Sequence, residues 1–260
     1  MASFPEIKGF LETSFTDWKG QVAAVVFLAR CNFRCPYCHN HRIVTSPHEV
    51  PTWPWDEVEK RLVRLRGWVD GVCVTGGEPT IHPGLPALLE RFRALGFRIK
   101  LDTNGSRPGV LASLLEAGLV DQVALDVKAP LEPVPYRRNA GSGSDPEAVD
   151  ASLHVLERTA IPLEIRTTVH PALLSSEEVC RLGRDLGRRF RSRAAEVGWT
   201  LQRCRTEEVL DPDLRDAPPL SPEEFAVWER AARTAFAQDR YPLDPPPGPR
   251  PGTKSRRDRP

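Results

Sequence analysis

Short runs of β-branched residues alternate along this chain with stretches that have the periodicity of amphipathic helices. This alternation is typical of successive βα units around a parallel sheet. We predict strands at residues 22–28, 71–75, 97–103, 122–128, 163–169 and 198–203. Helices are predicted at residues 56–65, 85–95, 109–117, 146–159, 177–190 and 222–238. The predicted fold class is α/β, and six parallel strands suggest a partial (β/α)6 barrel that stays open enough for a large substrate.

The composition is that of an ordinary globular protein. The 260 residues are 40% apolar and 27% charged, which allows one large α/β domain or two small ones. A net charge of +1 gives no reason to expect nucleic acid or an acidic surface as a partner. No run approaches a membrane span, and the N-terminus lacks a basic segment followed by an apolar one. Six cysteines, three of them clustered, do not resemble a secreted disulfide framework, so we expect a reducing cytoplasm.

Four segments can be separated along the chain. Residues 1–21 form an N-terminal extension, residues 22–212 the barrel, and residues 213–240 a C-terminal helix with Ser221 as a plausible N-cap. The last segment, residues 241–260, holds seven prolines and five basic residues. Such a composition cannot bury enough apolar surface to offset its ordering entropy, so we predict a disordered basic tail.

Three cysteines in the loop after the first strand indicate the chemistry. Cys31, Cys35 and Cys38 have the spacing C-x3-C-x2-C. A cubane iron–sulfur cluster normally takes four thiolates, so a loop that offers three leaves one iron open to another ligand. We therefore predict chemistry at the cluster.

Other metal and redox sites would use the same residues. Cys35 and Cys38 form a C-x-x-C that suits a redox dithiol, and with His39 they form the C-x-x-C-H of haem attachment. A structural zinc would need a fourth ligand, which His39 or His41 could supply. Haem attachment needs export, for which the N-terminus has no signal, and a dithiol leaves Cys31 unexplained.

Most of the unusual residues directly follow the predicted strands. In parallel βα barrels the C-terminal ends of the strands form the active face, because the βα loops converge there. The cysteine loop follows the first strand, and Gly76-Gly77-Glu78-Pro79 follows the second. The other strands end in Asp102-Thr103-Asn104-Gly105, in Asp126-Val127-Lys128, in Arg166-Thr167-Thr168 with His170, and in Gln202 with Cys204.

Charged residues recur on one face of three predicted strands. Residues two apart in a strand share a face. A packed barrel would have branched apolar residues inside, so a polar face indicates a lumen that holds a charged ligand. The residues expected there are Arg98, Lys100 and Asp102, then Asp126 and Lys128, then Glu164, Arg166, Thr168 and His170.

The cysteine loop followed by Gly-Gly-Glu-Pro at the next strand end resembles the radical S-adenosylmethionine (SAM) superfamily. The motifs Asp102-Thr103-Asn104-Gly105 and Asp126-Val127-Lys128 resemble the activating enzymes of glycyl-radical enzymes. Residues 9–14 and 22–40 look similar to the activating proteins of anaerobic ribonucleoside-triphosphate reductase. The resemblance covers roughly residues 7–212, and it implies the same partial (β/α)6 barrel.

The resemblance implies a cofactor and a reaction. Cys31, Cys35 and Cys38 would hold a [4Fe–4S] cluster, and the amino and carboxylate groups of SAM would chelate the open iron. An electron from a flavodoxin- or ferredoxin-type donor would then cleave a sulfur–carbon bond, releasing methionine and a 5′-deoxyadenosyl radical. The chain has no further C-x2-C run, so we expect one cluster only.

The cofactor contacts implied at the first two strand ends involve five residues. Gly76 and Gly77 would let the backbone approach the methionyl amino group, with Glu78 and Pro79 as the anchor of that turn. Tyr37 resembles the aromatic residue that contacts adenine.

Further contacts are implied at the later strands. Lys128 would supply a cation for the methionyl carboxylate, and Arg166 would help to hold the same ligand. Thr103 and Asn104 could hydrogen-bond to the ribose or the carboxylate, although an asparagine is also common in turns. His39 would support the cluster through its ring.

Two carboxylates at adjacent strand ends need a positive charge between them. Asp102 and Asp126 would otherwise repel each other. The resemblance implies a monovalent-cation site there, beside the cofactor. Asp102 could instead pair with Lys100 or Lys128.

Some residues are left over. We expect Cys73 and Cys180 to be inert, whereas Cys204 falls at a strand end and could touch the site. His170 loosely resembles a late active-site histidine, and a capping or surface histidine is an equal alternative.

The leading hypothesis is an enzyme that generates a glycyl radical on a partner such as anaerobic ribonucleoside-triphosphate reductase. A second keeps the same cofactor but takes a purine-like or pterin-like small molecule, as in deazaguanine-synthesising relatives. A third is a zinc-dependent binding module.

Overall fold

The computed structural model describes residues 4–193 and 195–240. Its strands are β1 (Ile7–Ser14), β2 (Ala23–Leu28), β3 (Gly71–Gly76), β4 (Arg98–Thr103), β5 (Gln122–Asp126), β6 (Leu163–Val169) and β7 (Val197–Arg203). Its helices are α1 (His41–Thr45), α2 (Trp55–Leu65), α3 (Leu85–Ala94), α4 (Pro108–Glu116), α5 (Pro133–Ala140), α6 (Pro146–Glu157), α7 (Ser176–Arg189), α8 (Pro212–Asp216) and α9 (Pro222–Arg240). Short 3-10 turns lie at Pro47–Glu49, Pro79–Ile81 and Arg191–Arg193.

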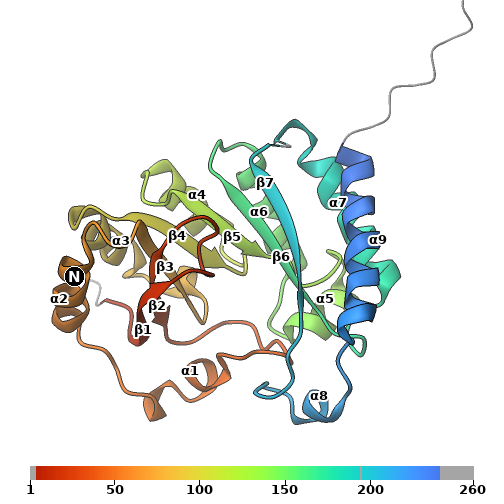
Figure 1. Ribbon diagram of the computed structural model, residues 1–260, viewed down its shortest axis with the longest axis horizontal. Helices are drawn as coiled ribbons and strands as arrows, with labels where there is room; N and C mark the ends of the chain where they lie inside the picture. The colour runs from red at the N-terminus through yellow and green to blue at the C-terminus, as the bar shows by residue number, and fades with distance from the viewer. Residues whose placement is uncertain (1–3, 194, 241–260) are drawn as a thin grey trace, which may run out of the picture.

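The strands form one seven-stranded sheet in the order β1 to β7. Every pair from β2 to β7 is parallel, which confirms the six predicted strands and the open barrel (Figure 1). The N-terminal segment expected to precede the barrel instead contributes β1, which pairs antiparallel with β2 at the edge of the sheet. The predicted tail, residues 241–260, lies outside the described residues.

The loop between β1 and β2 closes one end of the lumen. Trp18 is buried against Ala23, Val25 and Cys73, on the opposite strand face from Val72 and Val74. A side chain at Gly71 would meet the Trp18 ring at 2.6 Å, so the indole fills the space between strands. Cys73 is fully buried in this cluster, as predicted for a small hydrophobic residue.

Helix α9 covers α7 at the far edge of the molecule (Figure 1). Gly187 lets the two helices approach, because a Cβ there would lie 2.3 Å from the Phe236 carbonyl oxygen. The predicted N-cap is confirmed: Ser221 Oγ accepts from Glu224 N (3.2 Å), and the Glu224 carboxylate accepts from Ser221 N (2.8 Å). None of the helices in the described ranges combines the length and apolar character needed to cross a bilayer.

Candidate active site

The three cysteines of the loop after β2 face one cavity. Its volume is about 380 Å³, and Cys31, Cys35 and Cys38 line it together with residues from the ends of β3, β4, β5, β6 and β7. Within the described residues, no three His, Cys, Asp or Glu side chains converge on a single metal ion. In a cubane cluster each thiolate binds a different iron, so three cysteines on one cavity could serve three of its irons.

The cysteine loop is tied to its surroundings by hydrogen bonds. Arg34 donates from Nη1 to the carbonyl oxygens of Cys31 (2.6 Å) and Phe33 (2.8 Å), and its backbone N donates to Ala140 O (2.9 Å) at the end of α5. Asn40 Nδ2 donates to Gly76 O (2.7 Å), which joins the cysteine loop to the end of β3. Asn40 was not predicted as a site residue, because an asparagine after the last cysteine belongs to no known motif.

Burial keeps the cysteine thiols protonated in the cluster-free chain. It raises the pKa of Cys31 to about 12 and that of Cys35 to about 11, and it raises the pKa of Cys38 as well. Thiolates are the form that binds iron, so metal binding must displace these protons. Lys128 lowers the pKa of all three thiols, and Arg34 also lowers that of Cys38, so both cations favour the thiolate form.

The two glycines after β3 are required by the packing of the backbone itself. A Cβ on Gly77 would lie 1.7 Å from Arg30 O, and one on Gly76 would lie 2.3 Å from Leu28 N. Gly76 also has φ +115°, which disfavours any residue with a side chain. The glycines therefore let the ends of β2 and β3 touch, whatever ligand approaches them.

The buried carboxylate of Glu78 links the ends of β3 and β4 by hydrogen bonds. Its Oε1 accepts hydrogen bonds from Thr103 Oγ1 (2.7 Å), Thr80 N (3.0 Å) and Thr80 Oγ1 (2.5 Å), and its Oε2 accepts from Asn104 N (2.7 Å). Burial raises the pKa of the Glu78 carboxyl, although these hydrogen bonds act the other way. Pro79 is buried as well, in the 3-10 turn that follows. Glu78 therefore fixes the turn between β3 and β4 through its hydrogen bonds.

Replacing Glu78 by glutamine tests this role. We expect Glu78→Gln to lower the free energy of unfolding by about 1–3 kcal/mol, because the new NH2 group would face buried donors. Urea denaturation of the cluster-free protein measures it, with Glu90→Gln on the exposed face of α3 as the control. Equal stability of the two variants would show that the hydrogen bonds of the Glu78 carboxylate do not stabilise the fold.

The side chains of Thr103 and Asn104 form hydrogen bonds with other residues of the chain. Thr103 Oγ1 binds Glu78 and accepts from Gly105 N (3.1 Å). Asn104 Nδ2 donates to Asn32 Oδ1 (3.0 Å) and lies 3.7 Å from Cys31 Sγ, while its Oδ1 accepts from Ser106 N (2.9 Å). The Asn104 side chain thus joins the cysteine loop to the end of β4, and the Thr103 side chain supports Glu78. The contacts with ribose or carboxylate stay a prediction.

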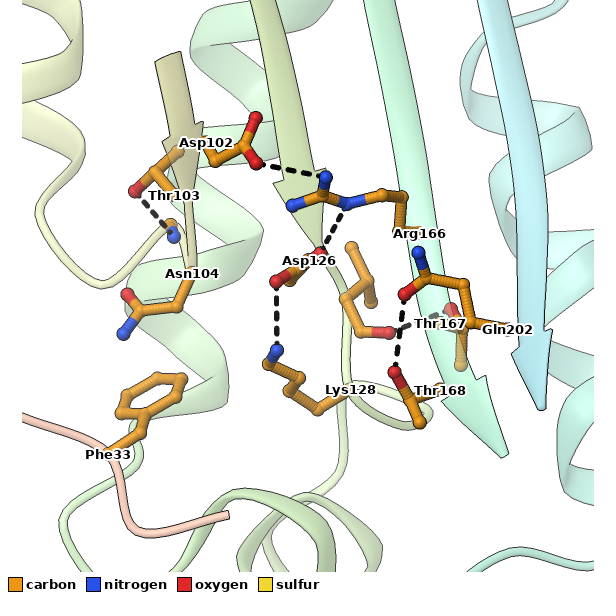
Figure 2. A network of polar contacts seen from close by, with 12 residues as sticks. Phe33, Asp102, Thr103, Asn104, Asp126, Lys128, Arg166, Thr167, Thr168 and Gln202 are labelled. Carbon is orange, nitrogen blue, oxygen red and sulfur yellow. Dashed lines mark hydrogen bonds and ion pairs between the residues drawn. The ribbon is translucent and has the colours of Figure 1, made fainter. Parts of the chain in front are cut away.

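Lys128 lies between a carboxylate and an aromatic ring. Its Nζ is 3.0 Å from Asp126 Oδ2 (Figure 2). The same Nζ lies 5.9 Å from the centre of the Tyr37 ring. Burial would lower the pKa of Lys128, but Asp126 outweighs it and raises the pKa well above its usual value. Tyr37 is buried, and its hydroxyl has no hydrogen-bond partner among the described residues. A buried cation and an unpaired hydroxyl on one cavity wall fit a ligand that carries a negative charge and a hydrogen-bonding group.

Arg166 joins the two strand-end carboxylates. It reaches from β6 to Asp126 and Asp102, the pair for which we predicted a monovalent cation. Although burial opposes ionisation, Arg166 and Lys128 hold the pKa of Asp126 well below its usual range. The positive charge expected between the carboxylates is therefore part of the chain.

The remaining predicted residues are less central. His39 is exposed at the cavity edge. His170 is buried outside it, and its Nδ1 accepts from Ala172 N (3.2 Å), as a capping histidine would. Cys180 and Cys204 do not line the cavity, although Cys204 is buried.

Two residues that line the cavity were not predicted as site residues. Asp17 belongs to the loop that closes the lumen, and its carbonyl oxygen accepts from Lys100 Nζ (2.6 Å). Gln202 pairs with Thr168 Oγ1 (3.4 Å) on the β7 side, where only its position at a strand end marked it.

Comparison with known proteins agrees with this geometry. Residues 25–179, more than half of the chain, match the profile of the Radical SAM superfamily. A Methanocaldococcus jannaschii protein, named as a candidate glycyl-radical enzyme activating enzyme, is 29% identical over 178 residues, 66% of this chain and 72% of that protein. A Methanothermobacter thermautotrophicus protein, named as a candidate GTP 3′,8-cyclase, is 37% identical over 230 residues, 81% of this chain and 68% of that protein.

A solved structure has the same fold. Coproporphyrinogen III oxidase from Escherichia coli, described as a radical SAM enzyme, gives a TM-score of 0.59 at 16% identity. The match covers 83% of this chain and 52% of that one, so the present chain spans about half its length.

Proposed function

Since the chain belongs to the Radical SAM superfamily, we propose that it generates a glycyl radical on a partner protein such as an anaerobic ribonucleoside-triphosphate reductase. Membership makes it a radical SAM enzyme that uses a [4Fe–4S] cluster and S-adenosylmethionine. When bound, these groups supply a 5′-deoxyadenosyl radical by one-electron cleavage of the sulfonium. In our proposal, a flavodoxin- or ferredoxin-type protein donates the electron, and a reducing cytoplasm is the setting.

The size of the cavity carries this proposal. About 380 Å³ lies near the lower end of the roughly 300–1,000 Å³ that one drug-sized ligand occupies. The cysteines, Lys128 and Tyr37 all line this one space, and in our proposal the cofactor occupies it. The substrate would then reach the site from outside, as an exposed loop of a partner protein can.

The chain's own residues have assignable roles in this proposal. Cys31, Cys35 and Cys38 hold the cluster, while Lys128 holds the methionyl carboxylate as a fixed cation. Tyr37 would contact the adenine, and its burial holds the ring in place. Glu78 contributes indirectly, because it locks the turn whose backbone faces the ligand.

The surface beside the cavity also suits a protein partner. A second hollow of about 400 Å³ shares His39 and Asn40 with the cavity. Its other lining residues include the exposed side chains of Arg42, Glu207 and Glu208. Small-molecule sites are mostly apolar and enclosed, whereas the rim of a protein interface is polar and open to water.

A small-molecule substrate is the second candidate. The relative named as a candidate GTP 3′,8-cyclase shares 37% identity over 81% of this chain, which supports a purine-like substrate. The relative named as a candidate activating enzyme supports the leading proposal at 29% identity. The two candidates share the cofactor and differ only in what gives up a hydrogen atom.

Electron paramagnetic resonance separates the two candidates. The protein is reconstituted anaerobically with iron and sulfide, reduced, and incubated with SAM and an anaerobic ribonucleoside-triphosphate reductase as the partner. We expect a doublet from a glycine α-carbon, which collapses to a singlet when the partner carries α-deuterated glycine. A partner whose radical-site glycine is replaced by alanine is the control. Cleavage of SAM with consumption of GTP, and no partner signal, would favour the small-molecule candidate.

A further inference from the structure

The site implied for a monovalent cation already contains a cation of the chain. Arg166 Nη1 lies 3.0 Å from Asp102 Oδ2, and Arg166 Nε lies 2.8 Å from Asp126 Oδ1 (Figure 2). The Asp102 and Arg166 side chains are only 8% and 15% exposed. The guanidinium thus bridges the two carboxylates in a largely buried setting, where a fork of N–H donors is well suited to this task.

The outer oxygens of the two carboxylates are paired as well. Asp126 Oδ2 faces Lys128 Nζ at 3.0 Å, and Asp102 Oδ1 faces Lys100 Nζ at 2.9 Å. Lys100 also lies 3.9 Å from Glu164 Oε2. Every oxygen of Asp102 and Asp126 therefore lies within ion-pair distance of a cation, although Asp102 Oδ1 accepts no hydrogen bond with good geometry. A metal ion could bind only by displacing one of these nitrogens, and it would then meet the guanidinium as a like charge.

The bridge follows from the strand register. Asp126 of β5 lies directly opposite Arg166 of β6, so this contact is between neighbours. Asp102 of β4 lies opposite Ala124 of β5, so it is two strands away from Arg166. A long side chain with several donors can reach both carboxylates, whereas the single ammonium of a lysine would act as one point charge.

We propose that Arg166 takes the place of a monovalent cation, so that this enzyme binds SAM without sodium or potassium. Arg166 acts as a positioning residue: it neutralises Asp126, which holds Lys128, and Lys128 faces the cofactor cavity. The guanidinium stays protonated at every working pH, so the charge is permanent. This inference rests on the family and on the ion pairs, and it holds whichever substrate the enzyme takes.

The test is the affinity of the cluster-loaded protein for SAM. Calorimetric titrations are run in choline chloride and in potassium chloride, both at about 0.1 M ionic strength, so that screening is equal. We expect the wild-type dissociation constant to agree within about twofold between the two salts, less than 1 kcal/mol. A loss of about tenfold or more in choline would overturn the proposal, because the native site would then need the ion.

A variant without the guanidinium should acquire the dependence on the ion. We expect Arg166→Met to bind SAM about tenfold more weakly in choline, a change of about 1.4 kcal/mol, and to recover most of the loss in potassium. Arg181→Met, which breaks the surface pair with Glu132 (2.9 Å), is the matched control and should bind like the wild type. Wild-type affinity of Arg166→Met in choline would also contradict the proposal. If Arg166→Met does not fold, the comparison of wild-type affinity in choline chloride and potassium chloride still tests the proposal.

Discussion

Replacing Cys35 by alanine is expected to abolish the iron–sulfur cluster and every activity that depends on it. Cys35 is buried and lines the cavity between Cys31 and Cys38, and no other cysteine lines that cavity. The cluster is held by three thiolates. Loss of one of them should remove most of the free energy with which the protein binds the cluster. The measurement is iron and sulfide content after anaerobic reconstitution, together with the visible absorption of the cluster.

Two cysteines outside the cavity provide the controls. Cys180 lies on α7, and Cys204 donates from Sγ to Arg205 O (3.4 Å). Cys180→Ala and Cys204→Ala should both load iron like the wild type. If Cys204→Ala lost the cluster while Cys35→Ala kept it, the assignment of the ligands would be wrong.

Replacing Gly77 by alanine is the second large effect that we expect. The new Cβ would lie 1.7 Å from Arg30 O, and a backbone oxygen cannot move away as a flexible side chain can. Overpacking costs about 1–3 kcal/mol where side chains can adjust, so we expect a loss at or above the upper end of this range. Denaturation of the cluster-free protein measures the loss, and titration with SAM should show that binding fails as well.

Gly109 offers a matched comparison. It lies in the first turn of α4, and no atom lies within 4 Å of the position that its Cβ would take. Gly109→Ala should change the stability by less than about 1 kcal/mol, in the stabilising direction that alanine has in helices. If Gly77→Ala were as stable as Gly109→Ala, the close approach of β2 and β3 would not constrain the site.

The strands and the active face could be predicted because local signals are strong there. Alternation along the chain identified β2 to β7, and parallel connections place their C-terminal ends together. Strand β1 was missed because its pairing with β2 depends on an irregular hairpin with register shifts at Ile7/Gly9 and Leu11/Ser14. No two-residue turn signal marks that hairpin in the sequence.

Which groups a polar side chain contacts could not be predicted from its position. Thr103 and Asn104 were placed correctly at the end of β4, and their contacts with Glu78 and Asn32 were not predicted. Arg166 was placed on the lumen side with Asp126, but a reach across two strands to Asp102 depends on side-chain length and rotamer. Periodicity gives the face of a strand, and only three-dimensional distances give the partner.

The formation of 5′-deoxyadenosine tests the central claim most directly. The cluster-loaded protein is reduced anaerobically with SAM, and the products are quantified by mass spectrometry. The three-cysteine site predicts 5′-deoxyadenosine and methionine in equal amounts from the wild type, and neither from Cys35→Ala. A wild-type sample that carries its full complement of iron and sulfide yet leaves SAM intact would contradict the account.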